Sequence, residues 1–228
     1  MPFAECTRVS GYLAVPRLLP MKHVPNALTA GRIVAAPVAL YLLWTGTAGG
    51  QTAGTALFIV AAITDYLDGR LARDYGVTSR LGQFMDPLAD KILVLGGFAL
   101  VPFLDPIGPG LAGPAGAWLP WTAIGAIAAR DAAVTALRAS YERRGMSLQT
   151  SNAAKWKTAW QLTFLIAAFV FLSATHLRPF GGTLGALGQA LAAVLAGPGP
   201  LVFLIVTAAV TVYTGWLYFR SATPPSAT

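Results

Sequence analysis

Residues 53–104 read AGTALFIVAAITDYLDGRLARDYGVTSRLGQFMDPLADKILVLGGFALVPFL. Two apolar segments, 53–72 and 87–104, lie on either side of a short polar connection at about residues 74–81. A helix that crosses a bilayer needs about 20 mostly apolar residues. This stretch therefore predicts two antiparallel transmembrane helices with acidic residues where they approach the connection.

Four further apolar segments extend this pattern over the rest of the chain: 33–47, 117–139, 156–174 and 201–219. The first is short, so we extend it back through Leu28, with Asn26 or Thr29 as its N-cap. Stretch 183–196 is marginal as a span, and we interpret it as an interfacial helix or an extension of the last span. The prediction is an all-α integral membrane protein, a bundle of six transmembrane helices.

The composition supports this class. The chain is 55% hydrophobic and 11% charged, whereas soluble domains carry about 25% charged residues. The net charge is +7. The basic residues lie between apolar segments, which favours membrane lipids and phosphorylated substrates over nucleic acid as partners. The single cysteine, Cys6, excludes an intramolecular disulfide and a cysteine zinc cluster.

Loop charges give the orientation, because Lys and Arg favour the cytoplasmic side. They gather before the first span, where Arg32 is the last of them, and in the second and fourth connections. The third connection holds only Asp105. We predict a multi-pass protein of the cell inner membrane with both termini cytoplasmic. A seventh span would place the C-terminus and Arg220 outside the cell, which the preference of Arg for the cytoplasmic side opposes. Residues 1–20 are interpreted as a poorly ordered extension, 21–220 as the membrane domain and 221–228 as a disordered tail.

Carboxylates are concentrated around the connection. Asp65 and Asp68 are three residues apart, and Asp86 and Asp90 four apart. On helices, both spacings place the paired side chains on one face, so both pairs are predicted to converge at the cytoplasmic end. Converging carboxylates near a membrane repel each other, and Mg²⁺ or Mn²⁺, two ions in our interpretation, would relieve that repulsion. Asp74 fits neither pair and is interpreted as a loop residue.

The alternative for any single aspartate is a helix cap or an ion pair with Arg70 or Arg80. Caps account for isolated carboxylates, but they do not account for two helical pairs separated by one connection.

The spacing of this segment resembles a family signature. Asp65, Asp68 and Gly69 are followed by Ala72 and Arg73, and after eight residues by Gly82, Asp86 and Asp90. The pattern D-x2-D-G-x2-A-R-x8-G-x3-D-x3-D is that of the CDP-alcohol phosphotransferases, and all eight specified positions match.

The resemblance implies a homodimer of six-helix protomers whose site opens to the cytoplasm. It implies that Asp65, Asp68 and Asp86 hold metal, that Asp90 joins them and acts as the general base, and that CMP leaves. The residues implied to bind the CDP-lipid are Gly69, Ala72, Arg73, Ser79, Gly82 and Thr29.

Shorter motifs narrow the resemblance within the family. Segments 24–32, 86–91, 136–138 and 155–158 are similar to those of phosphatidylglycerophosphate synthases, and 86–91 also to those of CDP-dependent cardiolipin synthases. This implies CDP-diacylglycerol and glycerol 3-phosphate as substrates. Arg130-Asp131 departs from the Arg-Glu that these synthases more often have.

An acceptor phosphate needs cations, and four flank the fourth connection: Arg130, Arg138, Lys155 and Lys157. Arg130 lies inside an apolar stretch, where an unpaired Arg is costly, so a ligand or Asp131 should face it. For Arg130 and Lys157, acceptor binding and pairing with protein carboxylates both remain open. Arg143 and Arg144 are interpreted as topology signals only.

Three functions remain in play. The first is phosphatidyl transfer to glycerol 3-phosphate. The second is a sister transfer to another acceptor, such as phosphatidylglycerol or an inositol phosphate. The third is cation transport, which the absence of a visible repeat and the one-ended cluster of carboxylates disfavour.

Overall fold

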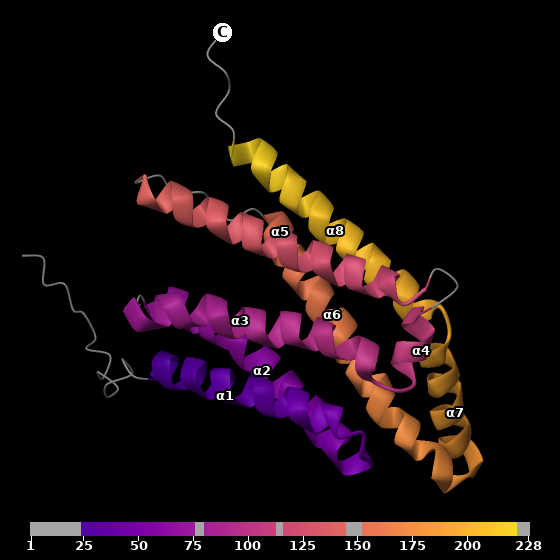
Figure 1. The fold of residues 1–228 in the computed structure, drawn as a ribbon. Coiled ribbons are helices and arrows are strands. Elements are labelled where there is room, and N and C mark those ends of the chain that lie inside the picture. Colours follow the sequence, from indigo (N-terminus) through magenta and orange to yellow (C-terminus); the bar gives the residue numbers. More distant parts are fainter. Residues whose placement is uncertain (1–23, 76–79, 113–115, 145–151, 223–228) are drawn as a thin grey trace, which may run out of the picture.

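A computed structural model describes residues 24–75, 80–112, 116–144 and 152–222. Within these ranges the side chains of 24–29, 65–75, 80–88, 90, 142, 152–156 and 221–222 lie outside the described part. The elements found in the described ranges are helices (Figure 1), without a strand among them, which confirms the all-α class.

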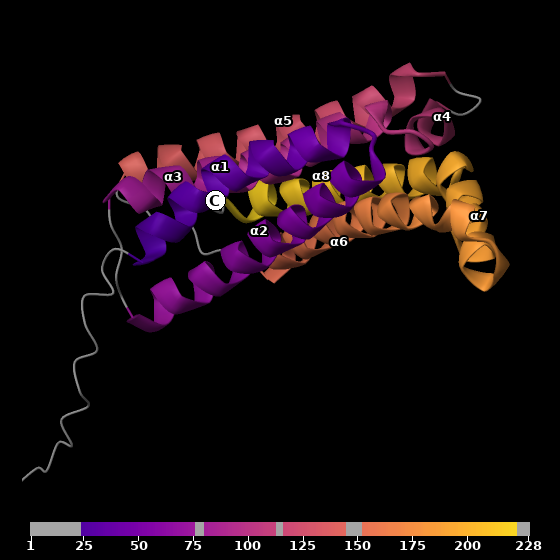
Figure 2. The same ribbon diagram turned by 90° about the horizontal axis from the view of Figure 1, so that it is seen from below.

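Six long helices form the bundle, and each corresponds to one predicted span. They are α1 (Val24–Trp44), α2 (Ala48–Tyr75), α3 (Arg80–Leu100), α5 (Trp118–Arg143), α6 (Asn152–Ala174) and α8 (Gly199–Ala222). They alternate in direction, so that the end of α2, the start of α3 and the end of α8 lie at one end of the bundle (Figure 2). We call this the motif end, and the other the distal end.

Two boundary predictions are wrong. Helix α1 already begins at Val24, so Asn26 and Thr29 lie within it and do not cap it. Helix α2 continues to Tyr75, so Asp74 is helical rather than a loop residue. The physical reason in α2 is local, because Leu71, Ala72 and neighbouring arginines favour a helix and no glycine or proline lies between Gly69 and Gly76.

The distal end contains more structure than the sequence predicted. The Gly/Pro-rich third connection contains α4 (Ile107–Ala112), which follows the short helix η2 (Val101–Phe103). Stretch 183–196 lies within α7 (Gly182–Ala196), which follows η3 (Thr175–Phe180) and crosses the distal end (Figures 1 and 2). Gly188 permits this close approach, since a Cβ there would lie 2.7 Å from the backbone nitrogen of Arg178. Gly197 ends α7 before α8 begins, so α7 is a separate helix rather than an extension of the last span.

Aromatic rings join the helices in the core. Phe58 of α2 meets Phe169 of α6 edge to face at 5.0 Å between centroids. Phe164 of α6 stacks at 5.5 Å on Phe98 of α3 and at 5.2 Å on Phe203 of α8. Each such pair stabilises packing by about 0.5–1.5 kcal/mol beyond its buried area. The interior therefore draws α2, α3 and α8 onto α6.

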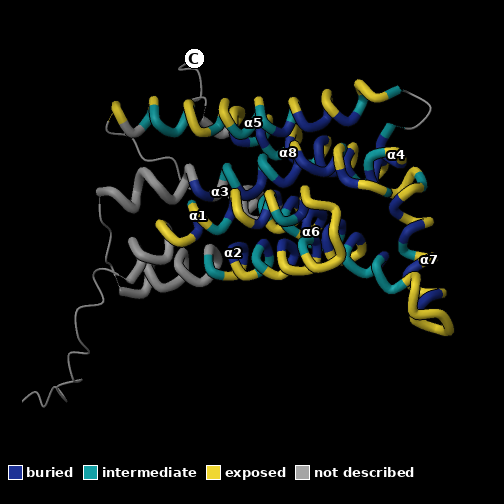
Figure 3. The backbone as a smooth tube through the Cα atoms, turned by 60° about the horizontal axis from the view of Figure 1, so that its bottom comes forward, coloured by how far each residue is buried: buried dark blue, intermediate teal, exposed yellow. Residues whose placement is uncertain are grey.

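Much of the outer surface is apolar. Buried and exposed positions alternate along the helices (Figure 3), and large apolar side chains remain exposed on α1, α2 and α8, among them Val34, Ile63 and Ile205. Two stretches are long and apolar enough to cross a membrane, 157–180 and 199–220, and four shorter apolar helical stretches accompany them. The structure thus contains the six predicted helices, while two of them meet the criterion for a span among the residues searched.

Candidate functional site

The four motif aspartates lie on the two helices that the sequence predicted. Asp65 and Asp68 are on α2, and Asp86 and Asp90 on α3. Asp65 and Asp68 lie in the second half of α2, Asp86 in the first half of α3, and Asp90 at the midpoint of α3. Their side chains lie outside the described residues, so their convergence and metal binding stay predictions.

The residues implied to bind the CDP-lipid are distributed over three helices. Gly69, Ala72 and Arg73 are on α2, Gly82 is on α3 and Thr29 is on α1. Ser79 lies outside the described residues. Helix α1 packs against both α2 and α3, so these elements form one body around the motif.

Arg32 on α1 is buried. We interpreted it from the sequence as the last of a group of N-terminal cations that set the topology, but the residue is only 3% exposed. It therefore belongs to the interior of the helix that packs against both motif helices. The available signal was its place well inside α1, beyond the point where a topology cation is expected.

A second group, which we call the ionic cluster, joins α5 to α6. Lys157 donates to both carboxylate oxygens of Asp131, with Nζ 2.6 Å from Oδ1 and 2.7 Å from Oδ2. Arg130 Nη1 lies 3.3 Å from the same Oδ1. The three side chains are only about a tenth exposed. Of the two partners predicted for Arg130, a ligand or Asp131, the structure shows Asp131. The pairing of Arg130 and Lys157 with a protein carboxylate is the arrangement observed.

Helix α8 fixes the orientation of Arg130. Its Nε donates to the backbone carbonyl of Thr211 at 3.0 Å, and Nη2 to the hydroxyl of Thr214 at 3.4 Å. Gly215 leaves the room for this, because a Cβ there would lie 2.7 Å from Arg130 Cγ. Gln161 Nε2 donates to Thr211 Oγ1 at 3.1 Å and is itself 1% exposed.

Sequence analysis did not identify these α8 and α6 partners. Thr211, Thr214 and Gln161 are ordinary polar residues of apolar helices, and only Gly215 carried a signal, as a small residue in such a helix. The other two proposed acceptor cations are on the same two helices: Arg138 lies further along α5, and Lys155 lies in the first turn of α6, where its side chain is outside the described part.

Position along the helices also differs from expectation. Arg130 lies near the middle of α5, not at its motif end, whereas Lys157 lies close to the start of α6. The ionic cluster is therefore set inside the bundle. A cluster at this depth suits a ligand that enters between the helices.

Comparison with known proteins matches this chain to one family. A model described as "CDP-alcohol phosphatidyltransferase" matches residues 22–213. A "CDP-diacylglycerol--glycerol-3-phosphate 3-phosphatidyltransferase" of Cereibacter sphaeroides is 30% identical over 220 residues, 88% of this chain and 96% of the relative.

Two further relatives are similar. An Arabidopsis thaliana protein named "CDP-diacylglycerol--glycerol-3-phosphate 3-phosphatidyltransferase 2" is 36% identical over 71% of this chain and 72% of its own length. A "Cardiolipin synthase (CMP-forming)" of Oryza sativa is 34% identical over 66% of this chain and 45% of its own length. With the complete motif on α2 and α3 and a family match over most of its length, the chain belongs to the CDP-alcohol phosphatidyltransferase family.

Proposed function

We propose that this protein transfers the phosphatidyl group of CDP-diacylglycerol to glycerol 3-phosphate, giving phosphatidylglycerol phosphate and CMP. The observation that carries the proposal is the complete eight-position motif on two adjoining antiparallel helices. The name of the Cereibacter relative, which aligns over 96% of its own length, supports the choice of both substrates.

The proposed chemistry is a displacement at phosphorus. Asp90 takes the proton of the acceptor hydroxyl, whose oxygen then bonds to the phosphorus that carries the lipid. The bond from that phosphorus to the oxygen of the CMP phosphate breaks, and CMP leaves with the electron pair. Gly69 and Ala72 on α2 are small and leave space for the nucleotide, and Arg73 supplies a cation for its phosphates.

The donor set fits a divalent metal. Four carboxylates, those of Asp65, Asp68, Asp86 and Asp90, offer the hard oxygen ligands that Mg²⁺ and Mn²⁺ prefer. When bound there, such ions would neutralise the diphosphate and hold the reacting groups in line. We expect excess chelator to abolish CMP release and either ion to restore it. Full turnover in chelator would contradict the metal proposal.

The ionic cluster is the proposed acceptor subsite. Glycerol 3-phosphate carries a phosphate dianion, and Arg130 and Lys157 are cations held inside the bundle. In the structure both cations form ion pairs with Asp131. The phosphate therefore competes with or shares the contacts of Asp131, and Arg138 and Lys155 lie on the same two helices as further cations along its path.

The proposed setting is the inner membrane, with six spans, both termini in the cytoplasm and two copies of the chain forming a homodimer. The antiparallel run of the six long helices supports the span count. A reporter fused after Arg220 should score cytoplasmic, and one inserted near Gly110 should score outside. The opposite result would mean that the motif end faces away from the cytoplasm, where the motif could not reach cytoplasmic substrates.

One alternative acceptor has an observation behind it, because the rice relative is named as a CMP-forming cardiolipin synthase. The same motif would then transfer the phosphatidyl group to phosphatidylglycerol. No such observation favours an inositol phosphate as acceptor, and family membership leaves cation transport without support.

An acceptor panel distinguishes the possibilities. Purified protein, CDP-diacylglycerol and Mg²⁺ are incubated with glycerol 3-phosphate, phosphatidylglycerol or inositol phosphate, and CMP release is measured. We expect release with glycerol 3-phosphate. Release with phosphatidylglycerol alone would move the assignment to cardiolipin synthesis, and no release with any acceptor would overturn the transferase proposal.

A further inference from the structure

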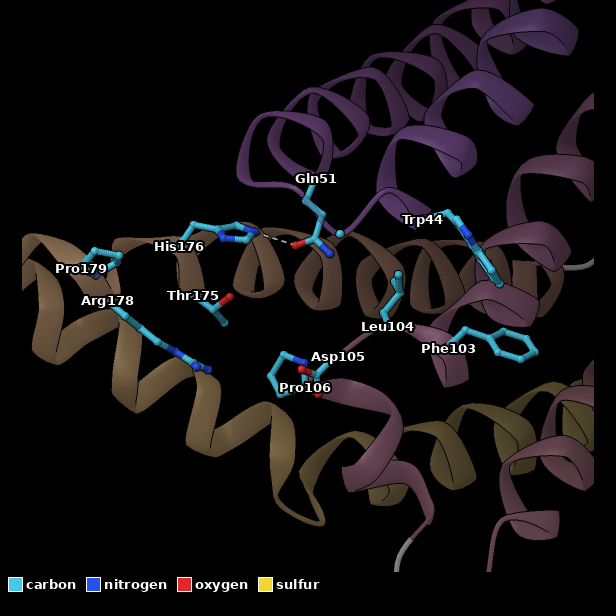
Figure 4. A pocket seen from close by; sticks show the side chains of 11 residues that line it. Trp44, Gln51, Phe103, Leu104, Asp105, Pro106, Thr175, His176, Arg178 and Pro179 are labelled. Atoms are coloured by element: carbon cyan, nitrogen blue, oxygen red, sulfur yellow. Dashed lines mark hydrogen bonds between the residues drawn. The ribbon is translucent and has the colours of Figure 1, made fainter.

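The distal end holds a polar cavity that the proposed reaction does not use. It has a volume of about 410 Å³ and lies between the α1–α2 connection, the η2–α4 connection and η3 (Figure 4). Its charged side chains are Asp105 and Arg178. His176 is hydrogen-bonded to Gln51, with 2.7 Å between Nε2 and Oε1. Figure 4 shows the Arg178 side chain extending across the cavity toward Asp105 and Pro106.

An apolar groove adjoins this cavity. Its volume is about 470 Å³, and it runs between α1 and α3, where its lining comes from Leu40, Tyr41, Trp44, Gly96, Ala99, Leu100 and Phe103. Trp44 and Phe103 also line the polar cavity, so the two spaces share a wall. Gly96 lets the Leu40 side chain of α1 approach α3 closely, since a Cβ there would lie 2.6 Å from Leu40 Cδ1.

The shared wall has the character of a membrane–water boundary. The rings of Trp44 and Phe103 lie 5.6 Å apart, and Phe103 meets Trp121 at 5.5 Å. All three residues are more than 40% exposed. In membrane proteins Trp is concentrated at the boundary between the acyl chains and the headgroups. The apolar groove on one side of this wall therefore suits an acyl chain, and the polar cavity on the other side suits a headgroup.

The charges of the cavity select the headgroup. It offers one guanidinium and one carboxylate, both from exposed residues, and the ion pairs recorded in the described part of the chain do not join Asp105 to Arg178. Guanidinium groups bind phosphate oxygens, and carboxylates bind ammonium groups. A headgroup with one phosphodiester and one ammonium satisfies both, whereas a purely anionic headgroup meets the Asp105 carboxylate.

We propose that the distal end binds one phospholipid with an ethanolamine-type zwitterionic headgroup. Its phosphodiester contacts Arg178, its ammonium contacts Asp105, and one acyl chain lies in the groove beside Gly96. The site lies at the far end of the bundle from the catalytic motif. This inference rests on the proposed membrane orientation, in which the distal end reaches the outer headgroup layer.

The test measures lipid retention. The protein is reconstituted in nanodiscs of equal phosphatidylethanolamine and phosphatidylglycerol, extracted in mild detergent, and its retained lipids are quantified by native mass spectrometry. We expect retention of phosphatidylethanolamine in preference to phosphatidylglycerol. Arg178→Ala and Asp105→Asn should each weaken this retention about tenfold, the effect of losing one charge-assisted hydrogen bond.

Controls separate this site from folding and from catalysis. Arg144→Ala removes an exposed arginine near the motif end and should retain lipid as the unchanged protein does. If Arg178→Ala fails to fold, Asp105→Asn still tests the site through its ammonium contact. CMP release, measured in parallel, reports on the proposed reaction alone, so selective retention without CMP release would remove that reaction and leave this site. Equal retention by the unchanged protein and both variants would overturn the site, and equal retention of the two lipids would overturn its headgroup.

Discussion

The motif helices α2 and α3 and the ionic cluster of α5, α6 and α8 differ in what specifies them. The motif is specified by spacing within one continuous segment, residues 65–90, so its chemistry could be read before any fold was known. The ionic cluster depends on residues from three helices, and Lys157 and Thr211 are far apart in the sequence.

This difference separates two kinds of functional signal. A local signal can be recognised from the sequence, because helix periodicity alone places Asp65 on the same face as Asp68. A dispersed signal depends on which helices become neighbours, and the same lysine could serve topology, structure or ligand binding. The predictions below test whether the motif carries chemistry and the cluster carries acceptor binding, from the largest expected effect to the smallest.

The largest effect is expected at the motif. Asp90→Asn removes the proposed base and should lower turnover by about 10²–10⁴-fold while leaving some affinity for the CDP-lipid. Asp68→Asn should instead weaken metal and nucleotide binding together. CMP release and CDP-lipid binding are measured for both. Asp74→Asn is the control, because Asp74 lies on α2 with Asp68 but belongs to neither pair. It should change both measurements little. Normal turnover in Asp90→Asn would show that the base is another group.

Removing the shared carboxylate of the ionic cluster should destabilise the fold. Asp131→Ala leaves Arg130 and Lys157 without the carboxylate that both contact, and breaking a buried ion pair in this way costs about 3–5 kcal/mol. Thermal unfolding in detergent measures the loss, with Arg144→Gln as an exposed-charge control. An unchanged midpoint would mean that the cluster is well solvated and contributes little to stability.

The cations themselves should affect one substrate more than the other. Arg130→Ala and Lys157→Ala should each raise KM for glycerol 3-phosphate by about 10- to 100-fold, as expected from losing a charge-assisted hydrogen bond. KM for the CDP-lipid should change much less, because the motif holds its diphosphate. Equal losses for both substrates would assign these residues to the fold rather than to the acceptor.

The smallest effect is expected from a single methyl group. In Gly215→Ala the new Cβ displaces the flexible Arg130 side chain and weakens one of its hydrogen bonds, which should raise KM for glycerol 3-phosphate by about three- to tenfold. Gly125→Ala is the matched control, since a Cβ there meets nothing within 4 Å. If both variants behave alike, Arg130 orientation does not matter for the acceptor.

Much of the fold could be predicted, because apolar length and helix-breaking residues act locally. The six long helices lie where the sequence placed them, and the marginal stretch 183–196 is helical. The errors have local causes too: α1 begins earlier than its polar residues suggested, and α4 forms within a Gly/Pro-rich stretch that the composition marked as a break.

The candidate site was predictable only in part. That Arg130 has a partner, either a ligand or Asp131, followed from the cost of an unpaired arginine in an apolar helix. The choice of the Thr211 carbonyl and of Lys157 as further partners could not follow, because it depends on how α6 and α8 pack against α5. The distal cavity was missed altogether, since His176 and Arg178 have no sequence spacing that marks them.

The contacts of Arg130 also bear on the order of synthesis. Arg130 and Asp131 are neighbours in the chain, so in the proposed membrane setting α5 would enter the bilayer with its cation already beside a carboxylate, which reduces the cost of insertion. Lys157 joins when α6 follows. The Thr211 carbonyl, the Thr214 hydroxyl and the space at Gly215 arrive only with α8, the last helix in the described part of the chain. A nascent chain halted before Gly199 would hold both cations and the carboxylate yet leave the guanidinium unoriented, so the proposed acceptor subsite would mature only once α8 has been made.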